Sequence, residues 1–339
     1  MSARGGVADR LPRVVVVGTG GTIASQGSTP AQTVGYGRAS LGADALIASV
    51  PAITTVADVR GEQLFQMLSG HLTSANWIAL ARRVNDLAAL DDVDGIVVTH
   101  GTDALEETAY WLTLTARTRK PVVLTGAMRP ASALSADGPM NLYNAIALAA
   151  SRSAVGMGVL VAMNDAIHAA RDAMKMRTAS PDAFGSPEFG ALGRMQDGVA
   201  QFHRRPLRRH TADSPFDVGR LDALPRVDVV YGHVGATRVP IDALVAAGTR
   251  GIVNAGFGQG DMTPDVLEGL QAARRQGVQV VRASRVPAGT VVADGALKDD
   301  ALDFVAADTL NPQKARVLLM LALTVTGDRR EIQRIFHEY

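Results

Sequence analysis

The sequence predicts a mixed α/β protein of two domains, each built on a parallel sheet. Apolar segments without polar alternation recur along the chain, as expected for strands that are buried on both faces. Helical patterns lie between these segments, which is the alternation typical of βαβ units. At 339 residues the chain is long for a single hydrophobic core, and about two domains is the natural expectation.

The composition excludes several classes of protein. Hydrophobic residues make up 47% of the chain, and the net charge of +1 gives no footprint for binding nucleic acid or an anionic membrane. No apolar run approaches the roughly 18 residues of a membrane span, and residues 1–13 lack the apolar core of a signal peptide, so we expect a cytoplasmic protein. The absence of cysteine excludes disulfides, thiolate metal sites and a cysteine nucleophile.

The first strand, residues 14–17, is a run of four valines followed by a glycine-rich turn that ends at Thr22. Glycines let the backbone turn where a side chain would clash, and open α/β sheets bind ligands at the carboxyl ends of their strands. A plain strand-to-loop turn is the alternative. A dinucleotide site does not fit, because the third glycine position of that motif falls on Ile23.

A polar segment without apolar periodicity, residues 25–38, follows this turn. Its lone aromatic residue, Tyr36, stands between two glycines. This pattern suits either a surface tyrosine or a hinged lid that carries one phenol over a pocket. The elements predicted next are a helix over 41–50, a strand over 53–59 and a helix over 76–90.

The second buried strand, residues 95–99, leads into a His-Gly-Thr-Asp sequence that ends at Asp103. A helix is predicted from Ala104 onward, and Asp103 with Glu106 resembles a capping box. Asp103 is therefore a structural N-cap, or it joins Thr102 as a second polar pair at the carboxyl end of a strand. Both interpretations can hold at once.

The first domain continues with strands over 121–125 and 157–163 and a helix over 140–150. Beyond them, Lys175 lies between two methionines. Only four of the 34 basic residues are lysines, so a lysine in these semi-apolar surroundings indicates a site that needs a compact amine with an adjustable pKa.

Residues 203–226 are rich in proline and arginine and predict a linker whose arginines form a solvated face. The linker separates a larger N-terminal α/β domain of the flavodoxin or Rossmann type, residues 1–202, from a smaller C-terminal α/β domain, residues 227–339. The strands predicted in the second domain are 227–231, 251–255 and 278–282, and its helices are 241–247, 264–276, 312–324 and 329–337.

Five motifs, in this order, resemble the bacterial asparaginase/glutaminase amidohydrolases. They are TGGTIAS (19–25), THGTDALEETAYWL (99–112), GAMRPASALSADGPMNL (126–142), SPFDVGRLDALPRVDVVYG (214–232) and NPQKARVLLMLALT (311–324). The resemblance spans nearly the whole chain. It is strongest to the homotetrameric asparaginases that are usually exported, although no export signal precedes this chain.

The resemblance implies a catalytic group of five residues. Thr22 matches the threonine that attacks the side-chain amide and forms an acyl intermediate, and Tyr36 matches the lid tyrosine that assists it. Thr102, Asp103 and Lys175 match the second threonine with its carboxylate and lysine. This chemistry requires no metal or other cofactor, and the seven scattered histidines form no ligand cluster.

The resemblance also implies the groups that bind the substrate. Ser69 matches a serine that holds the α-carboxylate, and the next position, where the family usually has Gln or Glu to contact the α-amine, is Gly70. The remaining positions on the same chain are Gly21, Gly101 and Ala127, with Thr102 and Asp103 serving here too.

Two polar loops, 254–263 and 285–296, are expected to border the active site of a neighbouring subunit, and we call them the border loops. The first carries Asp261, where the family usually has Asn or Ser. In the second, the usual acidic position falls near Ala296, with Asp294 close by.

The expected activity is hydrolysis of L-asparagine to L-aspartate and ammonia by a homotetramer built as a dimer of dimers, with glutaminase side activity left open. One alternative is the ammonia-releasing subunit of an amidotransferase, which carries an extra N-terminal domain, whereas only 13 residues precede the first strand here. The other is a non-catalytic amino-acid sensor on the same fold, which would be expected to lose the catalytic threonines or the lysine.

Overall fold

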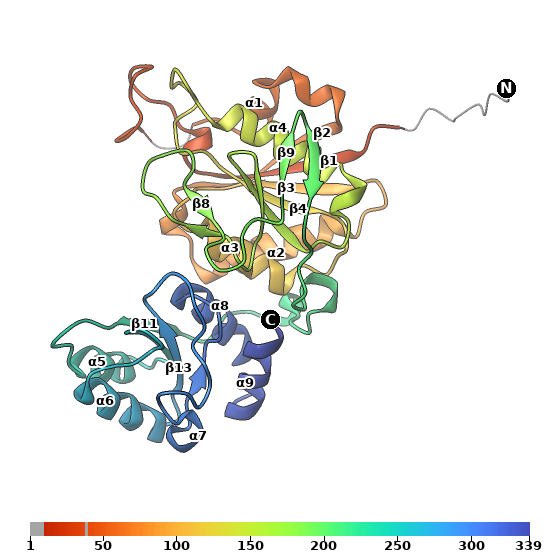
Figure 1. Ribbon diagram of the computed structural model, residues 1–339. Helices are drawn as coiled ribbons and strands as arrows, with labels where there is room; N and C mark the ends of the chain where they lie inside the picture. The colour runs from red at the N-terminus through yellow and green to blue at the C-terminus, as the bar shows by residue number, and fades with distance from the viewer. Residues whose placement is uncertain (1–9, 38–39) are drawn as a thin grey trace.

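The protein consists of two α/β parts, as the computed structural model shows for residues 10–37 and 40–339 (Figure 1). An eight-stranded sheet forms the N-terminal part, and a separate four-stranded sheet forms the C-terminal part. The predicted fold class is therefore confirmed. The first nine residues, expected to lack a signal peptide, and residue 38 of the polar segment lie outside the described residues.

The centre of the large sheet is parallel. Strand β1 (Arg13–Gly20) lies between β2 (Asp58–Met67) and β3 (Gly95–Thr99), and β4 (Val122–Thr125) and β5 (Val159–Met163) continue the sheet beyond β3. Every residue of β3, β4 and β5 is buried. The apolar runs of the sequence are thus strands that are covered on both faces.

Helices cover both faces of this sheet. Alternate valines of β1 point to opposite sides, as its two-residue period requires. Val15 and Val17 join the cluster under α2 (Ser74–Ala88) and α3 (Leu105–Thr115), whereas Val14 and Val16 join the one under α1 (Ala43–Ala48) and α4 (Gly138–Ala149) (Figure 1). The four helices match the predicted ones.

The far edge of the large sheet is antiparallel, which the sequence analysis did not predict. It consists of β6 (Ala166–Ala169), β9 (Gly193–Gln196) and β10 (Val199–Phe202). Each has only four residues, too few for a clear apolar pattern. The turn between β9 and β10 did carry a signal, since Asp197-Gly198 has positive φ at both residues and is a typical hairpin sequence.

The strand predicted over residues 53–59 is wrong in its first half. Pro51–Thr55 forms a short 3-10 helix, and β2 begins only at Asp58. The β-branched residues misled the prediction, because the hydroxyls of Thr54 and Thr55 bond back to the carbonyls of Pro51 and Ala52 at 2.9 and 2.7 Å. Such local bonds stabilise a turn against an extended strand.

The small sheet is wholly parallel, in the order β11 (Val227–Tyr231), β12 (Gly251–Gly256), β13 (Gln279–Ser284) and β14 (Val305–Ala306). Its first three strands match the predicted ones, and β14 is too short to have been detected. The helices of this part are α5 (Val239–Ala246), α6 (Pro264–Arg275), α7 (Asp299–Leu302), α8 (Pro312–Ala322) and α9 (Arg329–Glu338).

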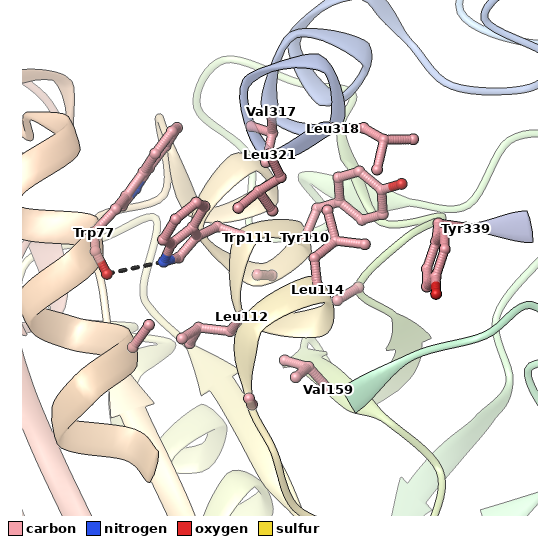
Figure 2. Close-up of a cluster of buried hydrophobic side chains, with 14 of the residues drawn as sticks. Trp77, Tyr110, Trp111, Leu112, Leu114, Val159, Val317, Leu318, Leu321 and Tyr339 are labelled. Atoms are coloured by element: carbon pink, nitrogen blue, oxygen red, sulfur yellow. Dashed lines mark hydrogen bonds between the residues drawn. The ribbon is translucent and has the colours of Figure 1, made fainter. Parts of the chain in front are cut away.

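Helix α8 belongs to the core of both parts. Its apolar residues Val317, Leu318 and Leu321 pack in the same cluster as Tyr110 and Trp111 of α3 (Figure 2). The segment 203–226, predicted as a linker, adds the buried side chains of Phe216 and Val218 to that cluster. The two sheets are therefore joined by a continuous hydrophobic core.

One buried ion pair lies in the small sheet. Arg282 of β13 and Asp299 at the start of α7 have side chains that are 1% and 0% exposed. The guanidinium binds the carboxylate in a bidentate manner, with Nε–Oδ1 and Nη2–Oδ2 distances of 2.5 and 2.6 Å. Two parallel charge-assisted hydrogen bonds offset part of the cost of taking both charges out of water.

The same pair fixes both border loops. Arg282 donates to the carbonyls of Gln259 and Val292 at 2.7 and 3.1 Å, one in each loop. Asp299 accepts from the main-chain N–H of Asp294 at 2.9 Å. The shape of the two loops is therefore set from inside the domain.

We expect Arg282→Met to lower the free energy of unfolding by about 3–5 kcal/mol, because Asp299 would be left buried without a counter-charge. Urea denaturation at fixed protein concentration measures this. The matched control is Arg238→Met, which breaks partly exposed pairs with Asp242 and Glu268 and should change stability much less. Equal losses in the two variants would contradict the assigned role.

Candidate active site

The carboxyl ends of β1, β2 and β3 meet at one edge of the large sheet. Gly21 has φ 86°, and a Cβ there would lie 2.4 Å from the Cα of Gly101. A Cβ on Gly101 would in turn lie 2.7 Å from Oγ of Ser69. Only glycine allows these backbones to touch. Thr22 and Thr102, each next to one of these glycines, are thereby brought to the same place.

Thr22 and Tyr36 form the first polar pair. Their hydroxyl oxygens lie 2.7 Å apart, and either can donate the hydrogen bond. Thr22 opens a short 3-10 helix directly after Gly21, and Tyr36 reaches it from the polar segment. The chain turns at Gly35, where φ is 67°, just before the tyrosine.

Lys175, Thr102 and Asp103 form the second group. The ammonium of Lys175 donates to Oγ1 of Thr102 at 2.9 Å and to Oδ1 of Asp103 at 2.6 Å. The lysine side chain is 17% exposed, whereas the aspartate is 79% exposed. A half-enclosed amine therefore links a buried hydroxyl to a carboxylate that faces solvent. Residues about 70 positions apart in the sequence are thus brought together.

Ser69 opens a short 3-10 helix after β2 and is buried beside the N-terminal end of α3. Its Oγ accepts from the main-chain N–H of Ala104 at 3.2 Å, so the serine hydrogen is left to donate elsewhere.

The predicted capping box is wrong, because the N-cap residue is Ala104 and no side-chain cap bond forms. The carboxylate of Asp103 binds the ammonium of Lys175 instead, and that of Glu106 accepts hydrogen bonds from residues later in the chain.

Glu106 is a residue that the sequence analysis missed as part of the site. It is 5% exposed, and its Oε2 accepts from the main-chain N–H of Lys175 at 2.8 Å. Its Oε1 accepts from the side-chain amides of Gln313 and, at 3.5 Å, Asn311. A buried carboxylate therefore holds the backbone of the lysine.

His100, which precedes Gly101, is fully buried. Its Nδ1 lies 2.7 Å from the carbonyl of Gly101 and must donate to it, since a carbonyl only accepts. Burial lowers the pKa of His100 to about 4, so the imidazole is neutral at physiological pH. It adds no charge to the strand edge.

The other predicted binding positions differ in how they are placed. Gly70 is exposed, and a Cβ there would meet no atom within 4 Å. The methyl group of Ala127 is buried in the α1–α4 core, so only its main chain is available to a ligand. Asp261 is exposed, and its carboxylate accepts from the N–H of Met262 at 2.8 Å. Within the described residues it makes no hydrogen bond to the groups around Thr22 and Thr102.

In the second border loop, the Asp294 carboxylate accepts from the N–H of Asp300 at 2.9 Å, and Ala296 is exposed. Over residues 10–37 and 40–339, His, Asp and Glu form no group of three that could hold a metal ion. No helix in the same stretch is long and apolar enough to cross a bilayer.

The structure contains a cavity of about 340 Å³ and a smaller one, which is lined in part by Met174, the residue before Lys175. The larger is lined by residues such as Arg204, Arg205 and Tyr339, and neither cavity is lined by any of the candidate site residues.

Comparison with known proteins identifies the family. Residues 13–208 match the family model "Asparaginase, N-terminal", and residues 226–336 match "Glutaminase/Asparaginase C-terminal domain". A glutaminase-asparaginase of Pseudomonas fluorescens biotype A is 48% identical over 331 residues, which are 97% of this chain and 91% of that protein. L-asparaginase 2 of Escherichia coli K12 is 45% identical over 334 residues, 98% of this chain and 95% of that one. A probable periplasmic L-asparaginase of Haemophilus influenzae is 45% identical over 97% of this chain and 93% of its own length.

Proposed function

Because the chain belongs to the asparaginase family, we propose that it hydrolyses L-asparagine to L-aspartate and ammonia, with L-glutamine as a secondary substrate. One observation carries the proposal: the Thr22–Tyr36 pair stands beside the Thr102–Lys175–Asp103 group at one sheet edge. The similar proteins are named L-asparaginase or glutaminase-asparaginase.

In the first step, Oγ1 of Thr22 attacks the carbonyl carbon of the side-chain amide. A threonine hydroxyl is a weak nucleophile and needs a partner that takes its proton. Tyr36, at 2.7 Å, is placed to accept it. When the C–N bond breaks, the proton goes to the leaving nitrogen, which departs as ammonia and leaves an ester on Thr22.

In the second step, water hydrolyses this ester and restores Thr22. Lys175 donates to Thr102 and Asp103 together, which forms a chain of groups able to take a proton from the attacking water. Main-chain N–H groups at the Gly21 turn and at the start of α3 would stabilise the oxyanion that develops in both steps.

The substrate's α-carboxylate is assigned to Ser69, whose hydrogen is free to donate. Its ammonium is assigned to Asp103, which is mostly exposed, and to Asp261 of a neighbouring subunit.

A sensor without catalysis would not need the Thr22–Tyr36 pair, which disfavours that alternative. A cytoplasmic location is kept as a proposal from the sequence, and cell fractionation tests it.

We expect Thr22→Ala and Thr102→Ala each to keep the fold and to lower turnover by several orders of magnitude, since loss of a nucleophile in comparable sites costs on the order of 10⁶ in rate. Ammonia release from asparagine measures this. Thr54→Ala, in the 3-10 helix before β2, is the control and should keep full activity. A threonine variant that retains more than a few per cent of the activity would show that its assigned role is wrong, whereas an acyl adduct trapped on Thr22 would support it.

We propose a homotetramer whose active sites are bordered by the border loops of neighbouring subunits. The absence of a hydrogen bond from Asp261 to the groups around Thr22 and Thr102, within the described residues, supports this. Light scattering should give about four times the chain mass of 35.5 kDa. A fully active monomer would refute the shared site.

Gly70 has no side-chain oxygen to accept a hydrogen bond from the substrate ammonium, which should weaken recognition of that group. A hydrogen bond to a charged group is worth roughly 1.5–3 kcal/mol, or about one to two decades in affinity. We therefore expect Gly70→Gln, whose Cβ has open space, to lower the KM for asparagine with kcat less affected. The companion variant is Asp261→Asn. If Gly70→Gln leaves KM unchanged while Asp261→Asn raises it sharply, the ammonium is already held across the interface and the gap is no defect.

A further inference from the structure

Lys314, on α8, is a buried cation that the proposed mechanism does not use. The residue is 2% exposed, and α8 lies at the boundary of the two parts (Figure 1). A lysine is almost never fully buried unless its amine is satisfied, because desolvating an ammonium is costly. Its contacts therefore indicate what the protein gains from it.

The amine of Lys314 donates to two main-chain carbonyls, those of Arg171 at 2.7 Å and Ala173 at 2.5 Å. These carbonyls directly precede β7 (Met174–Lys175), the strand that carries the candidate catalytic lysine. Lys314 thus holds the backbone on the N-terminal side of Lys175.

A second set of contacts from the same helix reaches the backbone of Lys175 itself. Asn311, the N-cap of α8, accepts from the N–H of Lys314 at 3.0 Å. Asn311 and Gln313 both donate to Oε1 of Glu106, and Oε2 of Glu106 accepts from the N–H of Lys175. Three main-chain atoms of the segment 171–175 are therefore tied, directly or through Glu106, to the first turn of α8.

The large sheet holds the start of this segment, where the N–H groups of Asp172 and Ala173 donate to the carbonyl of Ala169 in β6, but β7 itself lies outside that sheet. Strand β7 has two residues and pairs only with β8 (Phe184–Gly185), in a two-stranded sheet of its own. An isolated pair of this size is not stable alone. Yet the ammonium of Lys175 must stay within hydrogen-bond distance of Thr102 and Asp103, and a misplacement of about 1 Å can cost 10²-fold in rate.

The charges around Lys314 fit this role. Glu106 and Glu107 on α3 and Asp172 beside the bound carbonyls favour its ammonium form, whereas burial and the guanidinium of Arg171 disfavour it. The balance lowers the pKa of Lys314 to about 8, so the amine is mainly protonated at neutral pH.

We propose that Lys314 and Gln313 of α8 are positioning residues, which hold the segment 171–175 so that Lys175 keeps its hydrogen bonds to Thr102 and Asp103. The C-terminal domain thereby aligns a catalytic group of the N-terminal domain within one chain. The inference rests on the proposed function through the role of Lys175.

The test is a double-mutant cycle with Lys314→Met and Lys175→Met. Lys314→Met should lower kcat for asparagine by about 10–100-fold and change KM much less. In the Lys175→Met background it should have no further effect, because residues that act as a unit are not additive. An equal loss in both backgrounds would reflect a general structural role and would overturn the proposal, as would an unchanged kcat.

The control is Lys120→Met, since the Lys120 amine also donates to a main-chain carbonyl, that of Leu90, but away from the site. Hydrogen exchange gives a readout independent of activity. The peptide that contains the Lys175 amide should exchange faster in Lys314→Met and at the wild-type rate in Lys120→Met. If exchange there is unchanged, the segment is not held by α8.

If Lys314→Met does not fold, Gln313→Ala replaces it in the same double-mutant cycle. Gln313 is partly exposed, and its substitution removes a hydrogen-bond donor to Glu106. The two proposals fail differently. A wild-type protein that releases no ammonia from asparagine or glutamine contradicts the proposed function, and the exchange measurement still tests the positioning.

Discussion

The close approach of Gly21 to Gly101 is the contact on which the site depends. A side chain at either position would clash with the main chain or with Ser69, so both strand ends are limited to glycine. Their contact turns two separate strand-to-loop turns into one surface, with a threonine next to each. The proposed chemistry depends on this steric constraint, because Thr22 and Thr102 could act on one substrate only while these backbones touch.

Much of this arrangement could be predicted from the sequence. The valine runs, the glycine turns and the helical patterns are local signals, and they located most strands and helices. Thr22, Thr102, Asp103 and Lys175 were proposed from the strand ends, from the scarcity of lysine and from the resemblance of the motifs to a known family. The predictions that failed concern residues whose contacts lie far away in the sequence. Asp103 and Glu106 have the spacing of a capping box, but both are engaged by Lys175, which is about 70 residues away. The short antiparallel strands fold against an existing sheet edge and need no pattern of their own.

Lys314 shows the limit of such prediction most clearly. In the sequence it is an ordinary lysine in an amphipathic helix, a position that normally faces solvent. Its burial results from the packing of α8 against α3 and the segment 171–175, which the helix period does not reveal. Only the fold shows that its amine meets two carbonyls next to Lys175.

We infer that the C-terminal domain supports the proposed chemistry in two distinct ways. Helix α8 shares a hydrophobic core with α3 and binds the segment of Lys175 in the same chain, whereas the Arg282–Asp299 pair shapes the two border loops. In both cases a buried cationic side chain donates hydrogen bonds to main-chain carbonyls, so the backbone rather than a side chain is held in place. In this proposal the candidate catalytic groups of the N-terminal sheet can remain partly exposed, because their alignment is maintained from a second domain.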